Sequence, residues 1–175
     1  MTVTIERSRV FLPAPRWAVL AAHAVPLVVL PSSLWRVGLV LDLPVIGALN
    51  PLWTFTPVAE VVYILLLSIV GEAAALLTLG LVRPWGQVAP SWIPFIGGKP
   101  VNPVAAVTAS CVGAFFVLVV CVQMVAGGVG AGFSGILNAS GQVVMVACYL
   151  PFLAWPPLLL AVTYSYYRRN RAGTS

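Results

Sequence analysis

The sequence predicts an all-α fold, an integral membrane four-helix bundle whose first and fourth helices are kinked. Two observations lead to this class. Of the 175 residues, 61% are hydrophobic and 7% are charged, whereas soluble domains carry about 25% charged residues. The apolar residues also form four stretches, each long enough to cross a bilayer core of about 30 Å. Within a single transmembrane domain, 17–167, these stretches cover residues 17–41, 57–82, 104–126 and 142–167.

The first span follows a polar, basic lead-in, residues 1–16, that predicts no fold of its own. The span begins at Trp17 and contains Pro26 and Pro31, each of which removes a backbone donor and disturbs a helix. Two alternatives stay open from the sequence. Either one broken span covers 17–41, or a span ends near Pro31 and a short helix follows at the membrane surface.

The remaining spans are bounded by proline and glycine. Pro57 suits the first position of the second helix. The segment 83–103 contains five prolines and predicts ordered turns at the membrane surface. The fourth span contains three further prolines, Pro151, Pro156 and Pro157, which predict a bend.

The basic residues predict the topology. They lie before the first span, after the second and in a basic tail, 168–175, whereas the loop after the third span has none. The positive-inside rule then places both termini in the cytoplasm. Because topology accounts for the net charge of +5, that charge does not predict nucleic-acid binding, and membrane lipids are the expected surroundings.

Two acids within the second span are the candidate catalytic residues, Glu60 and Glu72. An ionisable group in a membrane helix costs about 2.5–3.5 kcal/mol on insertion scales and by default indicates function. Glu60 lies in the first turn, where the helix dipole also stabilises a carboxylate, so a structural role stays open. Glu72 lies about 18 Å further along, from twelve residues at 1.5 Å each, where hydrocarbon favours a neutral, proton-donating acid. A structural role for Glu72, as an interhelical hydrogen-bond partner, stays open as the less favoured alternative. Ser68, four residues earlier, shares its face.

Other polar and aromatic side chains are candidates for binding a substrate. His23, the only histidine, either relays protons to Glu72 or is a satisfied polar group in an apolar helix. For Arg36 and Asp42, a surface ion pair is favoured over binding of a substrate head group. The candidate substrate-binding residues are His23, Trp35, Trp53, Phe55, Tyr63, Ser68, Tyr149 and Trp155. No nucleotide-binding, hydrolase or metal-ligand motif is present, and we expect no cofactor and no metal.

Two parts of the sequence carry a family resemblance: HAVPLVVLPSSLWR, residues 23–36, and EAAALLTLGLVRPWG with PSWIPFIGG, within residues 72–98. They resemble small bacterial four-span membrane proteins. Some of these look like the membrane-bound terpene cyclases that close prenylated indole natural products of the drimentine kind. The resemblance implies a bacterial plasma membrane protein, a lipid-like prenylated substrate, and Glu60 and Glu72 as the acids that protonate an olefin.

The leading hypothesis is therefore a membrane-embedded terpene cyclase that closes a farnesyl-indole-like substrate by carboxylic-acid protonation. An apolar cavity with aromatic walls would stabilise the carbocation. The alternative hypothesis is a non-enzymatic membrane protein. It would be either a proton-coupled carrier, whose acids connect to both faces through water, or a structural subunit that packs through its glycine-rich spans.

Overall fold

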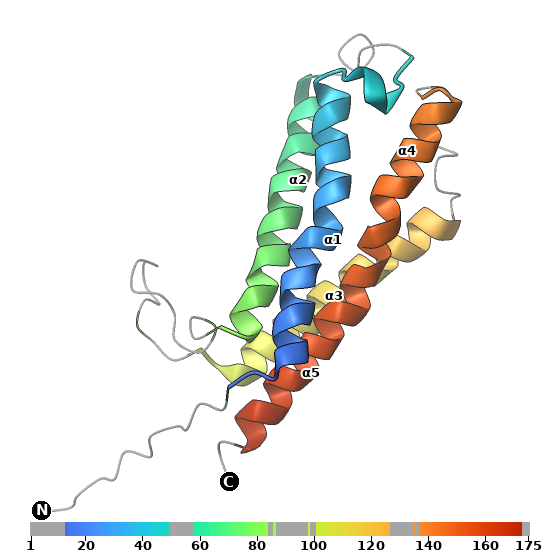
Figure 1. Cartoon of the computed structure of the whole chain (residues 1–175). Coiled ribbons are helices and arrows are strands. Elements are labelled where there is room, and N and C mark those ends of the chain that lie inside the picture. Colours follow the sequence, from blue (N-terminus) through green and yellow to red (C-terminus); the bar gives the residue numbers. More distant parts are fainter. Residues whose placement is uncertain are drawn as a thin grey trace, which may run out of the picture.

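The structure is a computed structural model that describes residues 13–49, 58–83, 86, 98, 101–126, 135 and 137–172. The all-α prediction is confirmed, because these ranges contain no β-strand and include four helices long and apolar enough to cross a membrane. The chain is thus a multi-pass membrane protein. Its helices are α1 (Arg16–Val40), η1 (Pro44–Ile46), α2 (Val58–Leu77), η3 (Thr78–Leu81), α3 (Pro103–Ala126), α4 (Ala139–Tyr149), η6 (Leu150–Ala154) and α5 (Trp155–Ala172), where η marks a 3-10 helix (Figure 1).

The first span is one α-helix. α1 continues from Arg16 to Val40 past Pro26 and Pro31, so the alternative in which the span ends near Pro31 is wrong. A proline inside a membrane helix is tolerated where neighbouring helices pack around it. α1 meets this condition because α2, α4, η6 and α5 all pack against it.

The fourth span changes its helix type at a proline. α4 ends at Tyr149, the 3-10 helix η6 contains Pro151, and α5 begins at Trp155. Pro151 has no N–H to donate to the carbonyl one turn earlier, which interrupts the α-helical pattern. Pro156 and Pro157 lie in the first turn of α5, where a missing N–H costs little.

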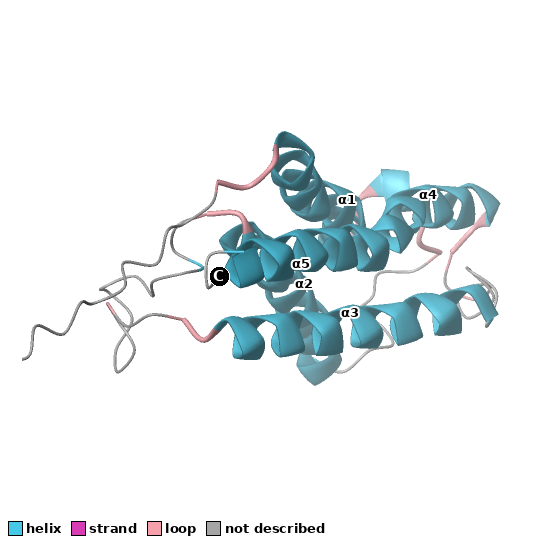
Figure 2. Ribbon diagram, turned by 90° about the horizontal axis from the view of Figure 1, so that it is seen from below, coloured by secondary structure: helices cyan, strands magenta, loops and turns pink. Residues whose placement is uncertain are grey.

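α1 packs against both α2 and α5, and α3 packs against α5. Seen from below, α5 lies between α1 and α3 (Figure 2). Buried residues of α1 and α5, among them Val25, Val162 and Tyr166, form one core. A second core joins Trp35 of α1 to Met145 of α4. α2 and α3 are not a closely packed pair, so they face each other across a space that α1 and α5 bound.

The start of α1 and the end of α5 lie at the same end of the bundle (Figure 1), which we call the basic end. Arg169 Nη2 donates a hydrogen bond of 2.6 Å to the Leu81 carbonyl there and ties α5 to η3. Among the basic residues that the structure describes, five lie at this end: Arg16, Arg83, Arg168, Arg169 and Arg171. The sixth is Arg36, close to the opposite end of α1.

Candidate functional site

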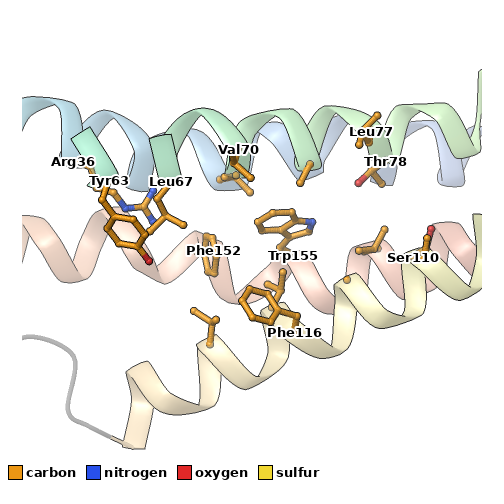
Figure 3. A pocket seen from close by; sticks show the side chains of 18 residues that line it. Arg36, Tyr63, Leu67, Val70, Leu77, Thr78, Ser110, Phe116, Phe152 and Trp155 are labelled. Atoms are coloured by element: carbon orange, nitrogen blue, oxygen red, sulfur yellow. The ribbon is translucent and has the colours of Figure 1, made fainter. Parts of the chain in front are cut away.

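The main feature between α2 and α3 is a cavity of about 650 Å³, within the range of small-molecule sites. α2 and α3 form its walls, and residues of α1, η6 and α5 lie between them (Figure 3). Eighteen described residues line it, and most of them are aliphatic or aromatic. Five of the eighteen have polar side-chain atoms: Arg36, Tyr63, Thr78, Ser110 and Trp155. None of the eighteen is an acid.

Two glycines on opposite walls widen the cavity. Gly71 of α2 and Gly113 of α3 both line it. Apart from the adjoining residues and the nearby backbone of the same helix, no atom of the described residues lies within 4 Å of the position that a Cβ would take on either glycine. The space beside each glycine belongs to the cavity.

Arg36 occupies one end of the cavity. Its Nε donates a hydrogen bond of 3.0 Å to the Tyr149 hydroxyl, and its Nη1 lies 3.5 Å from Ser68 Oγ. The guanidinium carbon also lies 5.4 Å from the centre of the Tyr149 ring, a cation–π distance. Trp35 packs edge-on against the same ring at 5.7 Å. Three candidate substrate-binding residues, Trp35, Ser68 and Tyr149, are therefore gathered around Arg36.

The predicted ion pair between Arg36 and Asp42 is wrong. Asp42 is exposed in the turn that follows α1, with a φ of 54°. The Arg36 side chain instead lies among Tyr149, Ser68 and the cavity. Asp42 lies in the turn after α1, whereas Arg36 lies within the helix. The turn therefore separates the Asp42 carboxylate from the Arg36 guanidinium.

Glu72 does not line the cavity. It is five residues from the cavity residue Leu67, a rotation of about 140° around α2, which places it on a different face. Its Oε1 is buried and has no hydrogen-bond partner among the described residues. Ser68 shares the face of Glu72, as its spacing predicted, but its hydroxyl donates to the Ile64 carbonyl at 3.0 Å.

His23 has hydrogen-bond partners other than Glu72. Its Nδ1 donates to the Val19 carbonyl at 2.7 Å, which leaves Nε2 to accept from Arg83 Nη2 at 3.3 Å. Glu72 precedes Arg83 by eleven residues, about 16–18 Å along α2 and η3. His23 therefore holds Arg83 at the basic end, as expected for a satisfied polar group, and among the described residues no hydrogen bond joins it to Glu72.

Tyr63 and Trp155 are the two candidate substrate-binding residues that line the cavity directly. Trp155 lies midway along it, between Arg36 at one end and Thr78 with Ser110 at the other (Figure 3). The Trp155 side chain is 5% exposed, and its indole Nε1 is buried with no hydrogen-bond partner among the described residues. Phe152 packs edge-on against it at 5.4 Å.

The other candidates fall outside what the structure describes. Trp53 and Phe55 lie beyond the described residues, and of Glu60 only the backbone, in the first turn of α2, is described. The sequence reasoning missed Phe116 and Ser110 as cavity residues. Their signal was weak, because any apolar span carries aromatic and small side chains that equally well face lipid.

Comparisons of the chain with protein-family models, with curated proteins and with solved structures found no match. A functional proposal therefore depends on the residues of this chain and their arrangement.

Proposed function

We propose that this protein binds a lipid-like molecule with a long apolar chain in the cavity between α2 and α3. The observation that carries the proposal is the cavity itself, which combines about 650 Å³ with a lining that is apolar apart from five residues. Along α2 it extends from Tyr63 to Thr78, fifteen residues or about 22 Å. This elongated shape suits a chain-like molecule.

Entry is from the side, between α2 and α3. Several wall residues are exposed at the surface as well as lining the cavity, including Tyr63 and Val70 on α2 and Phe116 on α3. A molecule dissolved in the membrane reaches such an opening without crossing water. In hydrocarbon, burial of apolar surface gives little net affinity, so close packing and polar contacts select the ligand. The unpartnered Trp155 N–H favours a ligand with an acceptor atom at this depth.

A second candidate function is cyclisation of the bound chain, and the aromatic lining favours it. Tyr63, Phe116, Phe152 and Trp155 line the cavity, and aromatic faces stabilise a carbocation in a site from which water is excluded. The acid gives its proton to one alkene carbon, and the cation is attacked by a second π bond to close the ring. The last cation returns a proton to the carboxylate, so the reaction needs neither oxidant nor cofactor.

Of the two acids, Glu60 suits this chemistry better than Glu72. Glu60 precedes the cavity residue Tyr63 by three positions, a spacing at which two side chains share a helix face. Glu72 is on a different face and lines no part of the cavity. The proposed cyclase therefore uses Glu60 as the proton donor, in a bacterial plasma membrane with the basic end in the cytoplasm.

Photo-crosslinking tests the proposed binding site. A farnesyl compound with a photoreactive diazirine at its tail should label Phe116, with labelling reduced by excess farnesol. Phe115 provides a matched control because both residues are 68% exposed but only Phe116 lines the cavity. Mass spectrometry of peptides from the purified protein gives the labelled positions. Equal labelling of Phe115 and Phe116, or labelling that farnesol does not reduce, would contradict the proposal.

Turnover of farnesylated indoles in detergent tests the proposed cyclase. Glu60→Gln should lower the rate of conversion by about 10²–10⁴-fold, the usual contribution of a general acid. Glu72→Gln should keep a rate close to that of the wild type, since its side chain does not line the cavity. Product analysis by mass spectrometry and NMR measures both. If Glu60→Gln converts the substrate as fast as the wild type, another group supplies the proton. If the wild type converts no farnesylated indole, the proposed cyclase function is ruled out.

A further inference from the structure

We propose that the ligand of this cavity is an anionic amphiphile, whose phosphate or carboxylate head group binds to Arg36 and whose apolar chain extends past Trp155. This inference rests on the proposed binding of a lipid-like molecule and adds the class of its head group.

The first argument is the charge of Arg36. A guanidinium stays protonated in proteins, and the residue is half-buried within a helix long enough to span a membrane. Its partners are two neutral hydroxyls, those of Tyr149 and Ser68. Among the described residues, Asp42 and Glu72 make no ion pair with it, since Asp42 is exposed beyond the helix and Glu72 lies on another face of α2. Among the described side chains, which do not include that of Glu60, the site is therefore positively charged and has no counter-ion.

The second argument is how the guanidinium is held. Nε and Nη1 each use one N–H on a protein oxygen, and the Tyr149 ring packs against the group. Of the five N–H groups of an arginine, three then have no hydrogen bond to the described residues. Arg36 lines the cavity, so these donors are available to a ligand. Paired donors of one guanidinium match the oxygens of a phosphate or a carboxylate.

The third argument is the polarity of the cavity along its length. Arg36 marks one end, and at the opposite end the polar groups of the described residues are two hydroxyls, those of Thr78 and Ser110 (Figure 3). The Ser110 hydroxyl is already used, because it donates to the Ala106 carbonyl at 2.8 Å. The lining between the two ends is apolar apart from Tyr63 and the Trp155 N–H. An anionic head at Arg36 with an apolar chain toward Thr78 matches this distribution.

The test compares three competitors of the farnesyl probe on the purified full-length protein in nonionic detergent: farnesol, farnesyl monophosphate and farnesoic acid. The wild type should bind both anions at least about 10-fold more tightly than farnesol, because hydrogen bonds between charged groups increase the affinity by at least this factor. Arg36→Gln should reduce both anions to the affinity of farnesol and leave farnesol itself unchanged. Arg168→Gln, which removes an exposed charge at the basic end, should keep the preference.

The possible outcomes separate the two proposals. Failure of all three competitors to displace the probe removes the binding function itself. Equal affinity of the wild type for farnesol and the anions, or a preference that persists in Arg36→Gln, overturns the head-group assignment alone. If Arg36→Gln does not fold, Tyr149→Phe removes one hydroxyl that orients the guanidinium and should weaken anion binding but not farnesol binding. Displacement by phosphatidylglycerol as strong as by farnesyl monophosphate supports the anion site and identifies a bulk phospholipid as its source.

Discussion

Replacing Gly113 by phenylalanine should abolish binding of a farnesyl probe while leaving the thermal stability of the protein close to that of the wild type. Gly113 lies on the α3 wall of the cavity, and no described residue beyond its own stretch of α3 comes within 4 Å of the position of its missing Cβ. The new ring therefore extends into empty space and occupies volume that the ligand needs. We expect the affinity to fall by more than about tenfold, or about 1.4 kcal/mol, in a displacement assay with the photoreactive farnesyl probe.

The neighbouring residue provides a matched control. Val112 is 63% exposed and does not line the cavity, so Val112→Phe adds the same ring to the same helix on the lipid-facing side. This control should bind the probe as the wild type does. Normal binding by Gly113→Phe would show that the ligand lies outside the cavity, and equal losses in both variants would indicate a general effect on α3.

Replacing Gly141 by valine should give the largest loss of stability of any single substitution proposed for this chain. The first turn of α4 packs directly on the backbone of the loop after α1, where a Cβ on Gly141 would collide with the Ile46 carbonyl oxygen and would lie 3.2 Å from Gly47 Cα. The same contact is held by a hydrogen bond of 2.9 Å from the Asn138 N–H to the Gly47 carbonyl. Both colliding groups are backbone, so neither can rotate away.

The size of this effect follows from the cost of overpacking a close contact, about 1–3 kcal/mol and occasionally more. A loss of about 2 kcal/mol corresponds to a Tm lower by about 4–8 °C in a chain of this length. Thermal unfolding in detergent, followed by the loss of the monodisperse peak in size-exclusion chromatography, measures the shift. Gly71→Ala is the control, because its Cβ would meet no described residue beyond its own stretch of α2 within 4 Å. An unchanged Tm for Gly141→Val would show that α4 is not packed on this loop.

The spans themselves could be predicted because each leaves its signal in a continuous stretch of sequence. The predicted stretch 104–126 matches α3, Pro103–Ala126, within one residue, and 57–82 matches α2 with η3, Val58–Leu81. Bilayer thickness sets the length of an apolar helix, so composition alone locates it. The path of α1 past Pro31 was not predictable in the same way, because neighbouring helices decide whether a proline ends a membrane helix.

The site residues were harder to predict than the spans, as Glu72 and Arg36 show. Both are ionisable groups in apolar helices, and the cost of burying a charge singled out Glu72. For Arg36, a surface ion pair with Asp42 was favoured over binding of a substrate head group. In the structure, Arg36 lines the cavity and Glu72 does not. Helical periodicity indicates which residues share a face of one helix, but it does not indicate which face lines a cavity.

The sequence by itself determined that this protein is all-α, crosses the membrane several times and carries a few costly polar groups within its spans. These properties depend on local composition and on the bilayer as solvent, so they can be predicted without knowing which helices pack against one another. Only the tertiary structure decided that α2 and α3 stand apart, that Gly71 and Gly113 widen the space between them, and that Arg36 closes one end of it. The physical reason is that lipid and protein interior are equally apolar, so hydrophobicity does not distinguish a helix face that packs from one that lines a cavity.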